Sequence, residues 1–205
     1  MTHEEAERFE ATIAAGGITL FPADTVYGLA VDPESENAVE RLYELKGRPP
    51  QRPAAVMFFD LEAALDALGD VPERTLATLR RILPGALTAI VPNPAGLYPL
   101  ACGPRPDRLG VRVPRLTGAI EPLSVVRRPV MQSSANLSGG ADARRLEDVD
   151  AAVRAGVDVE LDGGELPGTP STVVDLTGYG ASGEFRILRE GAVPAEELAG
   201  LLDLT

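Results

Sequence analysis

Short apolar runs alternate with segments of helical periodicity along most of the chain, and this alternation restricts the fold more than any other feature. The runs that predict strands are residues 18–21, 54–59, 86–91, 109–113, 129–132, 157–161, 171–176 and 185–190. The segments that predict helices are residues 2–15, 36–45, 60–69, 72–83, 117–126, 146–156 and 194–204. Interleaved strands and helices predict an α/β (or α+β) fold, in which helices flank a twisted mixed sheet. The spacing is too irregular to predict a doubly wound order, and 205 residues suit one domain over 1–205.

The first predicted helix has clear signals at both ends. Thr2 and Glu5 have the spacing of a capping box, in which each side chain bonds the backbone N–H of the other residue. The glycine pair Gly16–Gly17 then predicts the end of this helix.

The charge balance and the rare side chains exclude several classes of function. The formal net charge of −12 argues against non-specific nucleic-acid binding over the whole surface, but it permits a local basic pocket. The only histidine is His3, so we expect no histidine-based triad, histidine general base or His-rich metal site. Residues 163–172 have the glycine spacing of a phosphate-binding P-loop but lack its lysine, so any nucleotide is held in another way.

The cysteine content and the N-terminal sequence indicate a cellular location. Cys102 is the single cysteine and cannot form an internal disulfide, which fits a reducing compartment. The first seventeen residues are acidic and amphipathic, unlike a secretory signal, and no run of eighteen apolar residues occurs. We therefore expect a cytoplasmic protein that does not bind membranes.

The stretch "KGRPPQRP", residues 46–53, concentrates positive charge in a segment that its prolines stiffen. Lys46 is expected in the last turn of a helix, where a cation offsets the helix dipole. Arg48 and Arg52 follow in the loop, and rigid arginines at short spacing suit polyphosphate. A solvated charge run is the alternative, and the residues alone favour neither interpretation.

Two further polar stretches follow predicted strands. In "FPADTVYGLA", residues 21–30, a turn at Pro22 and a second turn at Gly28 are expected to place Asp24, Thr25 and Tyr27 at a strand end. The alternative is an ordinary turn with an Asx hydrogen bond from Asp24. In "MQSSANLSGG", residues 131–140, small hydroxyl and amide groups suit a sugar, a phosphate or a carboxylate, and the alternative is capping of a turn.

The remaining candidate segments lie later in the chain or in a long loop. Ser171 and Thr172 precede a strand and are equally consistent with an ordinary strand edge, and Arg189 ends the strand "FRILRE". Residues 92–106 hold five prolines and two glycines, and long loops of this kind are commonly functional. We expect residues 92–108 to form a lid.

Taken in order, these stretches resemble the YrdC/Sua5 family, whose members make threonylcarbamoyl-AMP. The matching pieces, which run from residue 22 to residue 191, are "PADTVYGLA", "KGRP", "LPGALTAIVP", "LGVRVP", "SSANLSG", "G-T-PSTVVDL" and "ILREG". No single piece decides the matter, but the ordered set is highly specific. The resemblance implies a mixed sheet around a deep basic cleft and the single-domain form without an appended second domain.

The resemblance also implies a reaction. L-threonine, bicarbonate (or CO2) and ATP give threonylcarbamoyl-adenylate and pyrophosphate. Partner proteins then transfer the threonylcarbamoyl group to adenosine 37 of tRNAs that read ANN codons. Mg²⁺ is expected to bind through ATP, and direct tRNA binding is expected to be weak at most.

The family signatures assign roles to individual residues. Lys46 and Arg48 match its Lys-x-Arg signature and are the expected catalytic residues. The residues expected to bind ATP are Lys46, Arg48, Arg52, Thr88, Arg112, Ser134, Asn136 and Arg189. The residues expected to bind L-threonine are Thr25, Tyr27 and Ser134. The positions that depart from the family pattern are Ala23, Arg52, Met57 and Gln132–Ser133.

Two alternatives from other classes remain at this stage. One is a related enzyme that handles carbamoyl-adenylate, which would depend on carbamoyl phosphate. The other is an RNA-binding module without synthase activity. The acidic net charge and the absence of tryptophan argue against the second alternative.

Overall fold

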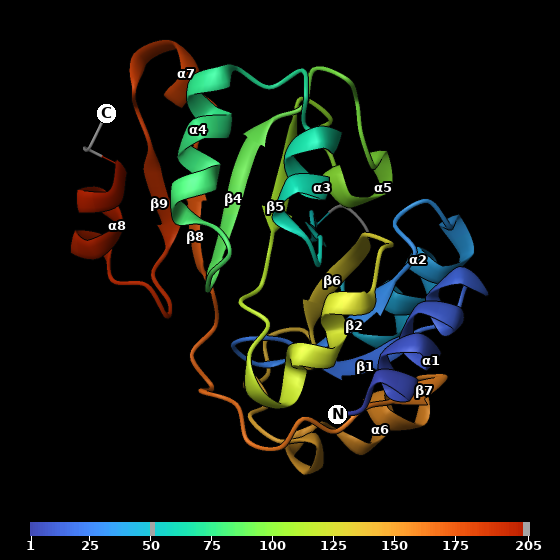
Figure 1. Ribbon diagram of the computed structural model, residues 1–205. Coiled ribbons are helices and arrows are strands. Elements are labelled where there is room, and N and C mark those ends of the chain that lie inside the picture. The colour runs from blue at the N-terminus through green and yellow to red at the C-terminus, as the bar shows by residue number, and fades with distance from the viewer. Residues whose placement is uncertain (50–51, 203–205) are drawn as a thin grey trace.

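A computed structural model describes residues 1–49 and 52–202. In this part of the chain, nine strands form a single mixed sheet in the order β7-β1-β2-β6-β3-β5-β4-β8-β9. The strands are β1 (Thr19–Pro22), β2 (Tyr27–Val31), β3 (Ala55–Met57), β4 (Leu87–Pro92), β5 (Arg108–Arg112), β6 (Val130–Ser134), β7 (Val159–Glu160), β8 (Thr172–Asp175) and β9 (Arg186–Arg189). The sheet twists strongly, so that β4, β8 and β9 run in a different direction from β1 (Figure 1). The predicted twisted mixed sheet is therefore confirmed.

Helices of the described residues cover the sheet (Figure 1). The α-helices are α1 (His3–Ala14), α2 (Glu36–Leu45), α3 (Leu61–Ala67), α4 (Glu73–Ile82), α5 (Pro99–Cys102), α6 (Ala151–Ala155), α7 (Tyr179–Ser182) and α8 (Ala195–Leu202). Two 3₁₀-helices are η1 (Gly118–Val125) and η2 (Leu146–Asp148). None of the helices in the described ranges is long and apolar enough to cross a lipid bilayer.

Helix α1 forms as its sequence predicts. The Thr2 hydroxyl accepts a hydrogen bond from the Glu5 backbone N–H at 3.2 Å, and the Glu5 carboxylate accepts one from the Thr2 N–H at 2.8 Å. The buried face of the helix consists of Ala6, Phe9 and Ile13. Phe9 packs against the rings of other aromatic residues in a core beneath α1 and η1. A larger core contains buried residues of α2, α3 and α4.

The sequence prediction missed β2. A second turn at Gly28 was expected, but Gly28 lies inside this buried strand, which pairs antiparallel with both β1 and β6. The glycine has a packing reason: a Cβ atom at position 28 would lie 2.7 Å from the Gln132 side-chain nitrogen. The prediction failed because close packing of a strand backbone needs the same small residue as a turn.

Three other predicted segments differ in detail. The segment 117–126 is a 3₁₀-helix that contains Pro122, a residue that cannot supply the N–H of a regular α-helix. The segment 146–156 divides into η2 and α6, and the predicted loop 92–106 contains α5. The closing helix was predicted to reach residue 204, but residues 203–205 lie outside the described part, as do residues 50–51 of "KGRPPQRP".

The sheet brings the polar stretches of the sequence together. Antiparallel pairing of β2 with β6 sets Gly28 opposite Ser134, and parallel pairing of β3 with β5 sets Ala55 opposite Gly110. Parallel pairing of β4 with β8 sets Thr88 opposite Val173. These pairings bring polar residues that are far apart in the sequence, among them Thr25, Arg48 and Ser134, around one cavity.

Candidate active site

A cavity of about 310 Å³ lies over β3, β4, β5, β6 and β8. Six of the residues predicted for the site line it, namely Thr25, Arg48, Thr88, Arg112, Ser134 and Arg189. Four others are absent from its lining, namely Tyr27, Lys46, Arg52 and Asn136. The structure therefore assembles part of the predicted set and assigns the rest to other contacts.

One end of the cavity contains a buried ion pair between Arg112 and Asp24. The Arg112 Nη2 atom lies 2.7 Å from Asp24 Oδ1, and both side chains are 5 % exposed. Arg112 also donates to the Gln132 side-chain oxygen at 2.9 Å and to the Thr25 hydroxyl at 3.3 Å. Burial raises the pKa of Asp24 above its ordinary value, and the Arg112 charge offsets part of that rise. Asp24 is therefore the charge partner of Arg112, and its side chain does more than form an Asx turn.

Arg48 and Arg189 carry positive charge that no carboxylate of the described residues neutralises. Arg48 donates to the Ser133 hydroxyl at 2.9 Å and to the Pro53 carbonyl at 2.6 Å. Burial lowers the pKa of Arg48. Arg189 donates to the Ser171 carbonyl at 2.7 Å and 3.2 Å. Neutral partners hold both guanidinium groups in place while leaving their charge available to an anion.

Lys46 does not line the cavity, although the sequence predicted it as a catalytic contact. It is 3 % exposed. Its Nζ atom donates to the Ser134 carbonyl, to the Asn136 carbonyl at 2.6 Å and to the Asn136 side-chain oxygen at 3.1 Å. Burial, with a contribution from the Arg48 charge, lowers the pKa of Lys46 to about 8. Lys46 therefore fixes the backbone next to the cavity.

Asn136 contacts both Lys46 and Ser134. Its side-chain oxygen accepts from the Ser134 hydroxyl at 2.6 Å, and its side-chain nitrogen donates to the Gly140 carbonyl at 2.5 Å. Both polar ends of the amide are used within the chain. Asn136 thus orients Ser134, which does line the cavity.

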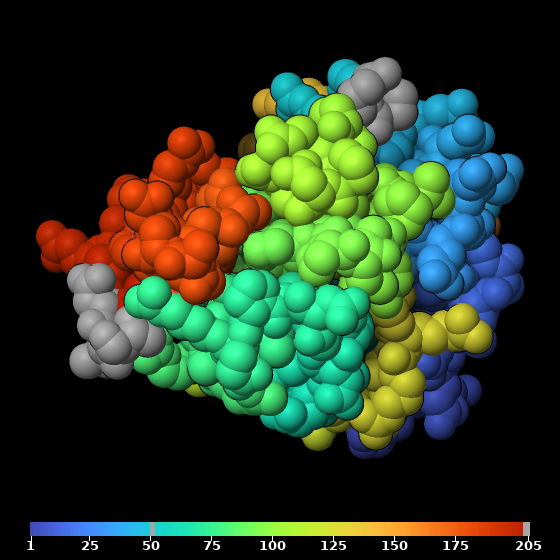
Figure 2. All heavy atoms as spheres, turned by 90° about the horizontal axis from the view of Figure 1, so that it is seen from above, coloured from blue at the N-terminus to red at the C-terminus, as the bar shows by residue number. Residues whose placement is uncertain are grey.

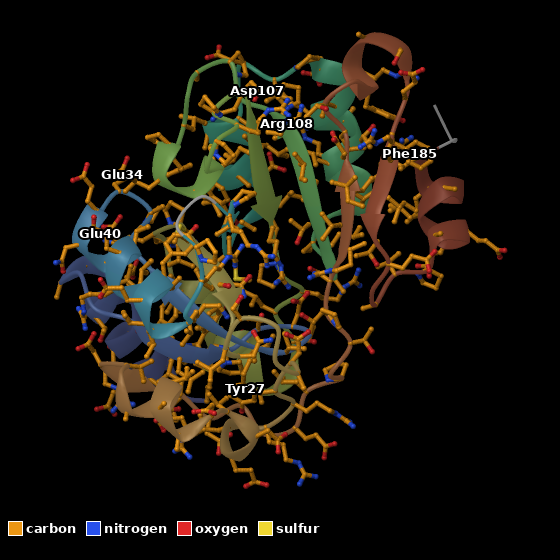
Figure 3. The ribbon with its side chains drawn as sticks, turned by 180° about the vertical axis from the view of Figure 1, so that it is seen from behind. Tyr27, Glu34, Glu40, Asp107, Arg108 and Phe185 are labelled. Carbon is orange, nitrogen blue, oxygen red and sulfur yellow. The ribbon has the colours of Figure 1, made fainter. Side chains whose placement is uncertain are left out.

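Tyr27 does not line the cavity, and its predicted contact with threonine stays a prediction. The Tyr27 side chain is fully buried, and its hydroxyl lies 2.9 Å from Asp162 Oδ1 and accepts from the Gly163 N–H at 3.0 Å. Burial, with the Asp162 contact contributing, raises the pKa of Tyr27 to about 12. Tyr27 and Gly28 are neighbours in β2, so they face opposite sides of the sheet. Figure 3 shows Tyr27 far from Arg108, which lies toward the other end of the molecule.

Arg52 is exposed and borders residues outside the described part of the chain. Its backbone carbonyl accepts a hydrogen bond from the Tyr43 hydroxyl at 2.7 Å. Met57, at a position where some family members have histidine, is fully buried in the core beneath α1. The hydrogen bond of Arg52 thus uses its backbone, and its charge contributes to the lowered pKa of Arg48, whereas Met57 has a packing role. Contact of Arg52 with ATP stays a prediction.

Sequence reasoning left the role of Ser171 open and did not identify Arg105, Arg108 or Asp142 as part of the lining. Ser171 shares a hydrogen bond of 2.9 Å with Thr88 and thereby supports Arg189. Arg105, Arg108 and Asp142 also line the cavity. Arg108 was detectable, because it lies four residues before Arg112 and alternate residues of a strand share a face.

Buried atoms without hydrogen-bond partners cluster at this site. They include Arg48 Nε, Arg108 Nε, Arg112 Nε and Asp24 Oδ2. Such atoms are costly to leave unpaired, and a bound polar ligand is one way to satisfy them. The cavity therefore has the character of a site for a polar, anionic ligand.

A metal held by protein side chains does not fit the described residues. They contain no group of three or more His, Cys, Asp or Glu side chains suited to hold a metal ion. Among the described lining residues, Asp142 is the only carboxylate.

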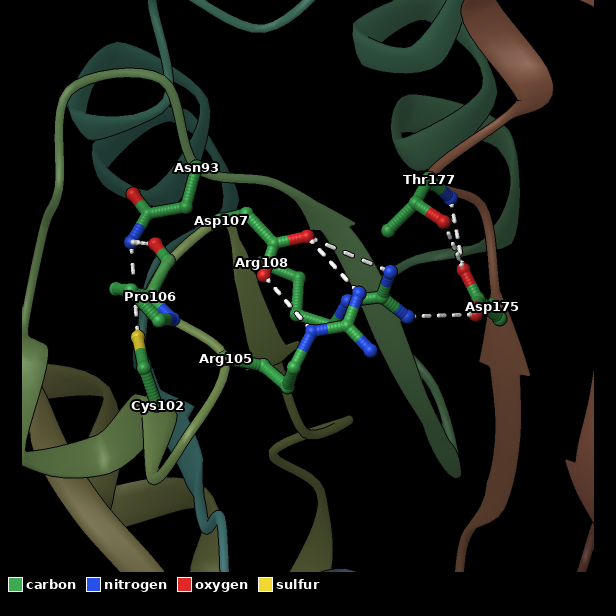
Figure 4. A network of polar contacts seen from close by, with 8 residues as sticks. All are labelled: Asn93, Cys102, Arg105, Pro106, Asp107, Arg108, Asp175 and Thr177. Carbon is green, nitrogen blue, oxygen red and sulfur yellow. Dashed lines mark hydrogen bonds and ion pairs between the residues drawn. The ribbon is translucent and has the colours of Figure 1, made fainter.

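The predicted lid, residues 92–108, is held by internal contacts. The Asn93 side chain donates to the Leu97 carbonyl at 2.9 Å and to the Pro106 carbonyl at 3.1 Å. Figure 4 shows Asn93 beside Cys102 and Pro106. Cys102 is buried and lines the cavity. Closure of this segment over a ligand stays a prediction.

Comparison with curated proteins gives related sequences over most of the chain. A protein named threonylcarbamoyl-AMP synthase from Pyrococcus abyssi is 32 % identical over 201 residues, which are 95 % of this chain and 58 % of that protein. One named putative threonylcarbamoyl-AMP synthase from Mycobacterium tuberculosis is 32 % identical over 191 residues, or 93 % of this chain and 85 % of that protein. The chain spans only 58 % and 55 % of the curated relatives from P. abyssi and Bacillus subtilis.

Solved structures agree with this relationship. Sua5 of P. abyssi complexed with L-threonine superposes with a TM-score of 0.83 at 29 % identity, covering 98 % of this chain and 58 % of that one. YciO of E. coli has the same fold, with a TM-score of 0.79 at 22 % identity over 96 % of this chain and 94 % of that one. Residues 11–191 match the family model of Sua5, YciO and YrdC proteins, which is described as "Telomere recombination". The chain belongs to the Sua5/YciO/YrdC family.

Proposed function

We propose that this chain makes L-threonylcarbamoyl-adenylate from L-threonine, bicarbonate or CO2, and ATP, with release of pyrophosphate. The observation that carries the proposal is the pair Arg48 and Arg189, which bring positive charge to a cavity rich in hydroxyl groups and have no carboxylate partner within residues 1–49 and 52–202. Membership of the family and the names of the curated relatives support the same reaction.

The chemistry needs positioning and charge neutralisation more than strong acids or bases. The threonine amine attacks CO2, loses a proton and becomes a carbamate. A carbamate oxygen then attacks the α-phosphorus of ATP, and the bond to the β-phosphate oxygen breaks to release pyrophosphate. Phosphoryl and nucleotidyl transfers of this kind depend chiefly on in-line placement and on cations that stabilise phosphate charge.

The geometry suggests how the residues divide the work. Arg48 and Arg189 would bind the triphosphate, and Ser134 would lie where the two substrates meet. Thr25 and Arg112 would orient the small substrate at the end where Asp24 balances the Arg112 charge. Thr88 would act through Ser171, which holds Arg189.

Lys46 and Asn136 act indirectly in this proposal, because they shape the backbone around Ser134. Mg²⁺ would enter with ATP and be held by phosphate oxygens, where it neutralises negative charge. Downstream proteins would consume the adenylate and transfer its threonylcarbamoyl group to tRNA.

Mass detection of the product tests the proposal. Purified protein with ATP, threonine and bicarbonate should form threonylcarbamoyl-adenylate and an equal amount of pyrophosphate. Omission of threonine should abolish both products. Product formation that requires carbamoyl phosphate in place of bicarbonate and threonine would contradict the proposal.

Arg48→Ala tests the residue on which the proposal depends most. Loss of a charge-assisted phosphate contact should reduce pyrophosphate release by about tenfold or more. Arg127→Ala, which removes an exposed arginine outside the cavity lining, is the matched control and should retain normal turnover. Near-normal turnover of a folded Arg48→Ala variant would show that Arg48 does not bind the triphosphate.

A further inference from the structure

Asp142 places a negative charge in the wall of a cavity that five arginines of the described residues also line. Three other aspartates pair with arginines of this lining, with distances of 2.7, 3.1 and 3.2 Å between nitrogen and oxygen. The half-buried Asp142 carboxylate differs from them, because it forms no ion pair and accepts no hydrogen bond within residues 1–49 and 52–202. A ligand can therefore use both of its oxygen atoms.

The backbone next to Asp142 is fixed at one end of the cavity. The Ala143 carbonyl accepts a hydrogen bond from the Tyr27 N–H at 3.0 Å, which ties this segment to the start of β2. Ser134 ends the neighbouring strand β6, and Thr25 precedes β2 by one residue. Asp142 therefore shares its end of the cavity with Thr25 and Ser134.

The Asp142 charge also acts on Lys46. Burial and the Arg48 charge lower the pKa of Lys46, and the Asp142 charge opposes them. The Lys46 ammonium group nevertheless donates to the Ser134 carbonyl, to the Asn136 carbonyl at 2.6 Å and to the Asn136 side-chain oxygen at 3.1 Å. All three of its protons are used there, so Lys46 does not occupy the Asp142 carboxylate.

The substrates of the proposed reaction differ in charge, and a carboxylate discriminates between them. ATP and bicarbonate are anions, which a carboxylate repels. The α-amino group of an amino acid is largely protonated at neutral pH, and its hydrogen bonds to a carboxylate are charge-assisted and strong. The Asp142 end therefore suits the amine of the amino-acid substrate better than it suits phosphate.

We propose that Asp142 binds the α-amino group of the amino-acid substrate and accepts the proton that this nitrogen releases when it bonds to CO2. This inference rests on the proposed function, which requires such a proton acceptor. The only histidine of the sequence is His3, so a histidine base is not at hand near the cavity. Asp142 is then a catalytic residue.

The proton transfer balances in atoms and charge. The ammonium group first gives one proton to solvent. The neutral amine then uses its lone pair to form an N–C bond to CO2, and one C=O electron pair moves onto oxygen. The nitrogen now carries a positive charge and is acidic, so one N–H proton passes to Asp142 and leaves the carbamate anion. Asp142 returns the proton to solvent.

Binding of two ligands that differ only in the amine tests the contact. L-threonine has the α-amino group, and (R)-3-hydroxybutyrate has hydrogen in its place. In calorimetry, Asp142→Asn should weaken threonine binding by about tenfold and change (R)-3-hydroxybutyrate binding by less than about twofold. Equal weakening of both ligands would show that Asp142 only shapes the cavity, and the inference would be wrong.

Turnover at saturating threonine tests the proton transfer. Asp142→Asn should reduce kcat for adenylate formation by about 100-fold, the lower range for loss of a general base. Asp142→Glu keeps the carboxylate and should recover part of this loss. The KM for ATP should stay within about twofold of wild type. A normal kcat in folded Asp142→Asn, or a raised Mg²⁺ requirement with normal threonine binding, would overturn the inference.

Glu184→Gln is the matched control. Glu184 is an exposed carboxylate that lines a neighbouring surface hollow but does not line the cavity. Seen from above, this hollow lies where the green segment near residue 105 faces the orange β8–α7–β9 segment (Figure 2). Removal of its charge should leave threonine affinity and kcat unchanged. Thermal melting of each variant checks that the fold is retained.

The results distinguish this inference from the proposed function. If the wild-type protein forms the adenylate but folded Asp142→Asn binds threonine and turns over normally, only the inference fails. If the wild-type protein binds threonine through Asp142 but forms no adenylate, the proposed function and the proton transfer fail and the amine contact holds. If the wild-type protein neither binds threonine nor forms the adenylate, both proposals fail.

Discussion

The Lys46 ammonium group donates to three oxygen atoms of residues 134–136. The sequence identified this lysine together with Arg48, but it did not reveal that the two side chains point to different places. Lys46 is the C-cap of α2, and Arg48 follows after Gly47, which has a φ of 56°. Such a change of direction depends on backbone conformation and tertiary contacts, which local residue patterns do not specify.

The titration of Lys46 provides a direct test, because it is the only lysine in the sequence. Burial lowers its pKa from 10.5 to about 8 in the folded protein. Between these values the unfolded chain binds more protons, so the stability of wild type relative to Lys46→Met should rise with pH, by at most about 1.4 kcal/mol per pH unit. Denaturant unfolding from pH 7 to 10.5 measures this difference, and NMR of the lysine side chain reads the pKa. A constant stability difference would contradict the prediction.

Tyr27→Phe tests whether Tyr27 has a structural role or contacts threonine. The hydroxyl contacts Asp162 and Gly163 inside the protein, so its removal leaves a buried N–H without its acceptor. We expect the free energy of unfolding to fall by about 1–3 kcal/mol. The KM for threonine should stay unchanged. A large rise in that KM without loss of stability would show that Tyr27 contacts threonine.

At the scale of elements, strands β1, β3, β4, β5, β6, β8 and β9 and the longer helices α1, α2, α3, α4 and α8 occur where the sequence predicts them. Strand β2 escaped prediction because Asp24 and Thr25 before it, and Gly28 within it, are typical of turns. The pairing of β2 with β6 then decides where Thr25 lies. Pairing between distant strands is a long-range property, which local periodicity does not supply.

Gly110 of β5 lines the cavity, and larger residues at this position test whether its small size leaves room for a ligand. Gly110→Ala should be tolerated, because the added Cβ makes an ordinary contact of 3.5 Å with Ala55. Gly110→Leu should place its side chain in the cavity and weaken ATP binding by about tenfold or more. Calorimetry measures both variants. Normal ATP binding by folded Gly110→Leu would show that the nucleotide does not lie over β5.

At the scale of the whole molecule, an acidic protein concentrates arginines around one cavity. Arg48, Arg105, Arg108, Arg112 and Arg189 line it, although the net charge of the chain is −12. The sequence predicted a basic cleft and several of its residues from the ordered motifs. It did not predict which arginines are neutralised, because Asp24 reaches Arg112 and Asp175 reaches Arg108 only through tertiary contacts.

The same charge distribution predicts weak binding to tRNA. Phosphate contacts need exposed cations, and the net charge of −12 opposes a polyanion at long range. We expect a Kd of about 10⁻⁴ M or weaker at physiological salt, the weak end of non-specific binding. Titration of labelled tRNA at two salt concentrations measures it. Tight binding that falls steeply with salt would favour an RNA-binding role.

The pairing of β4 with β8 also has a consequence for biosynthesis. Leu87 of β4 lies opposite Thr172 of β8, so one edge of β4 stays open while the ribosome makes the intervening chain. An unpaired strand edge is a template for pairing with other chains. Because Ser171, Val173 and Arg189 arrive late, the nascent protein has an exposed β4 edge and an incomplete cavity until the last part of its translation. Delayed closure of this edge makes the growing chain, more than the finished protein, the form that needs protection by chaperones.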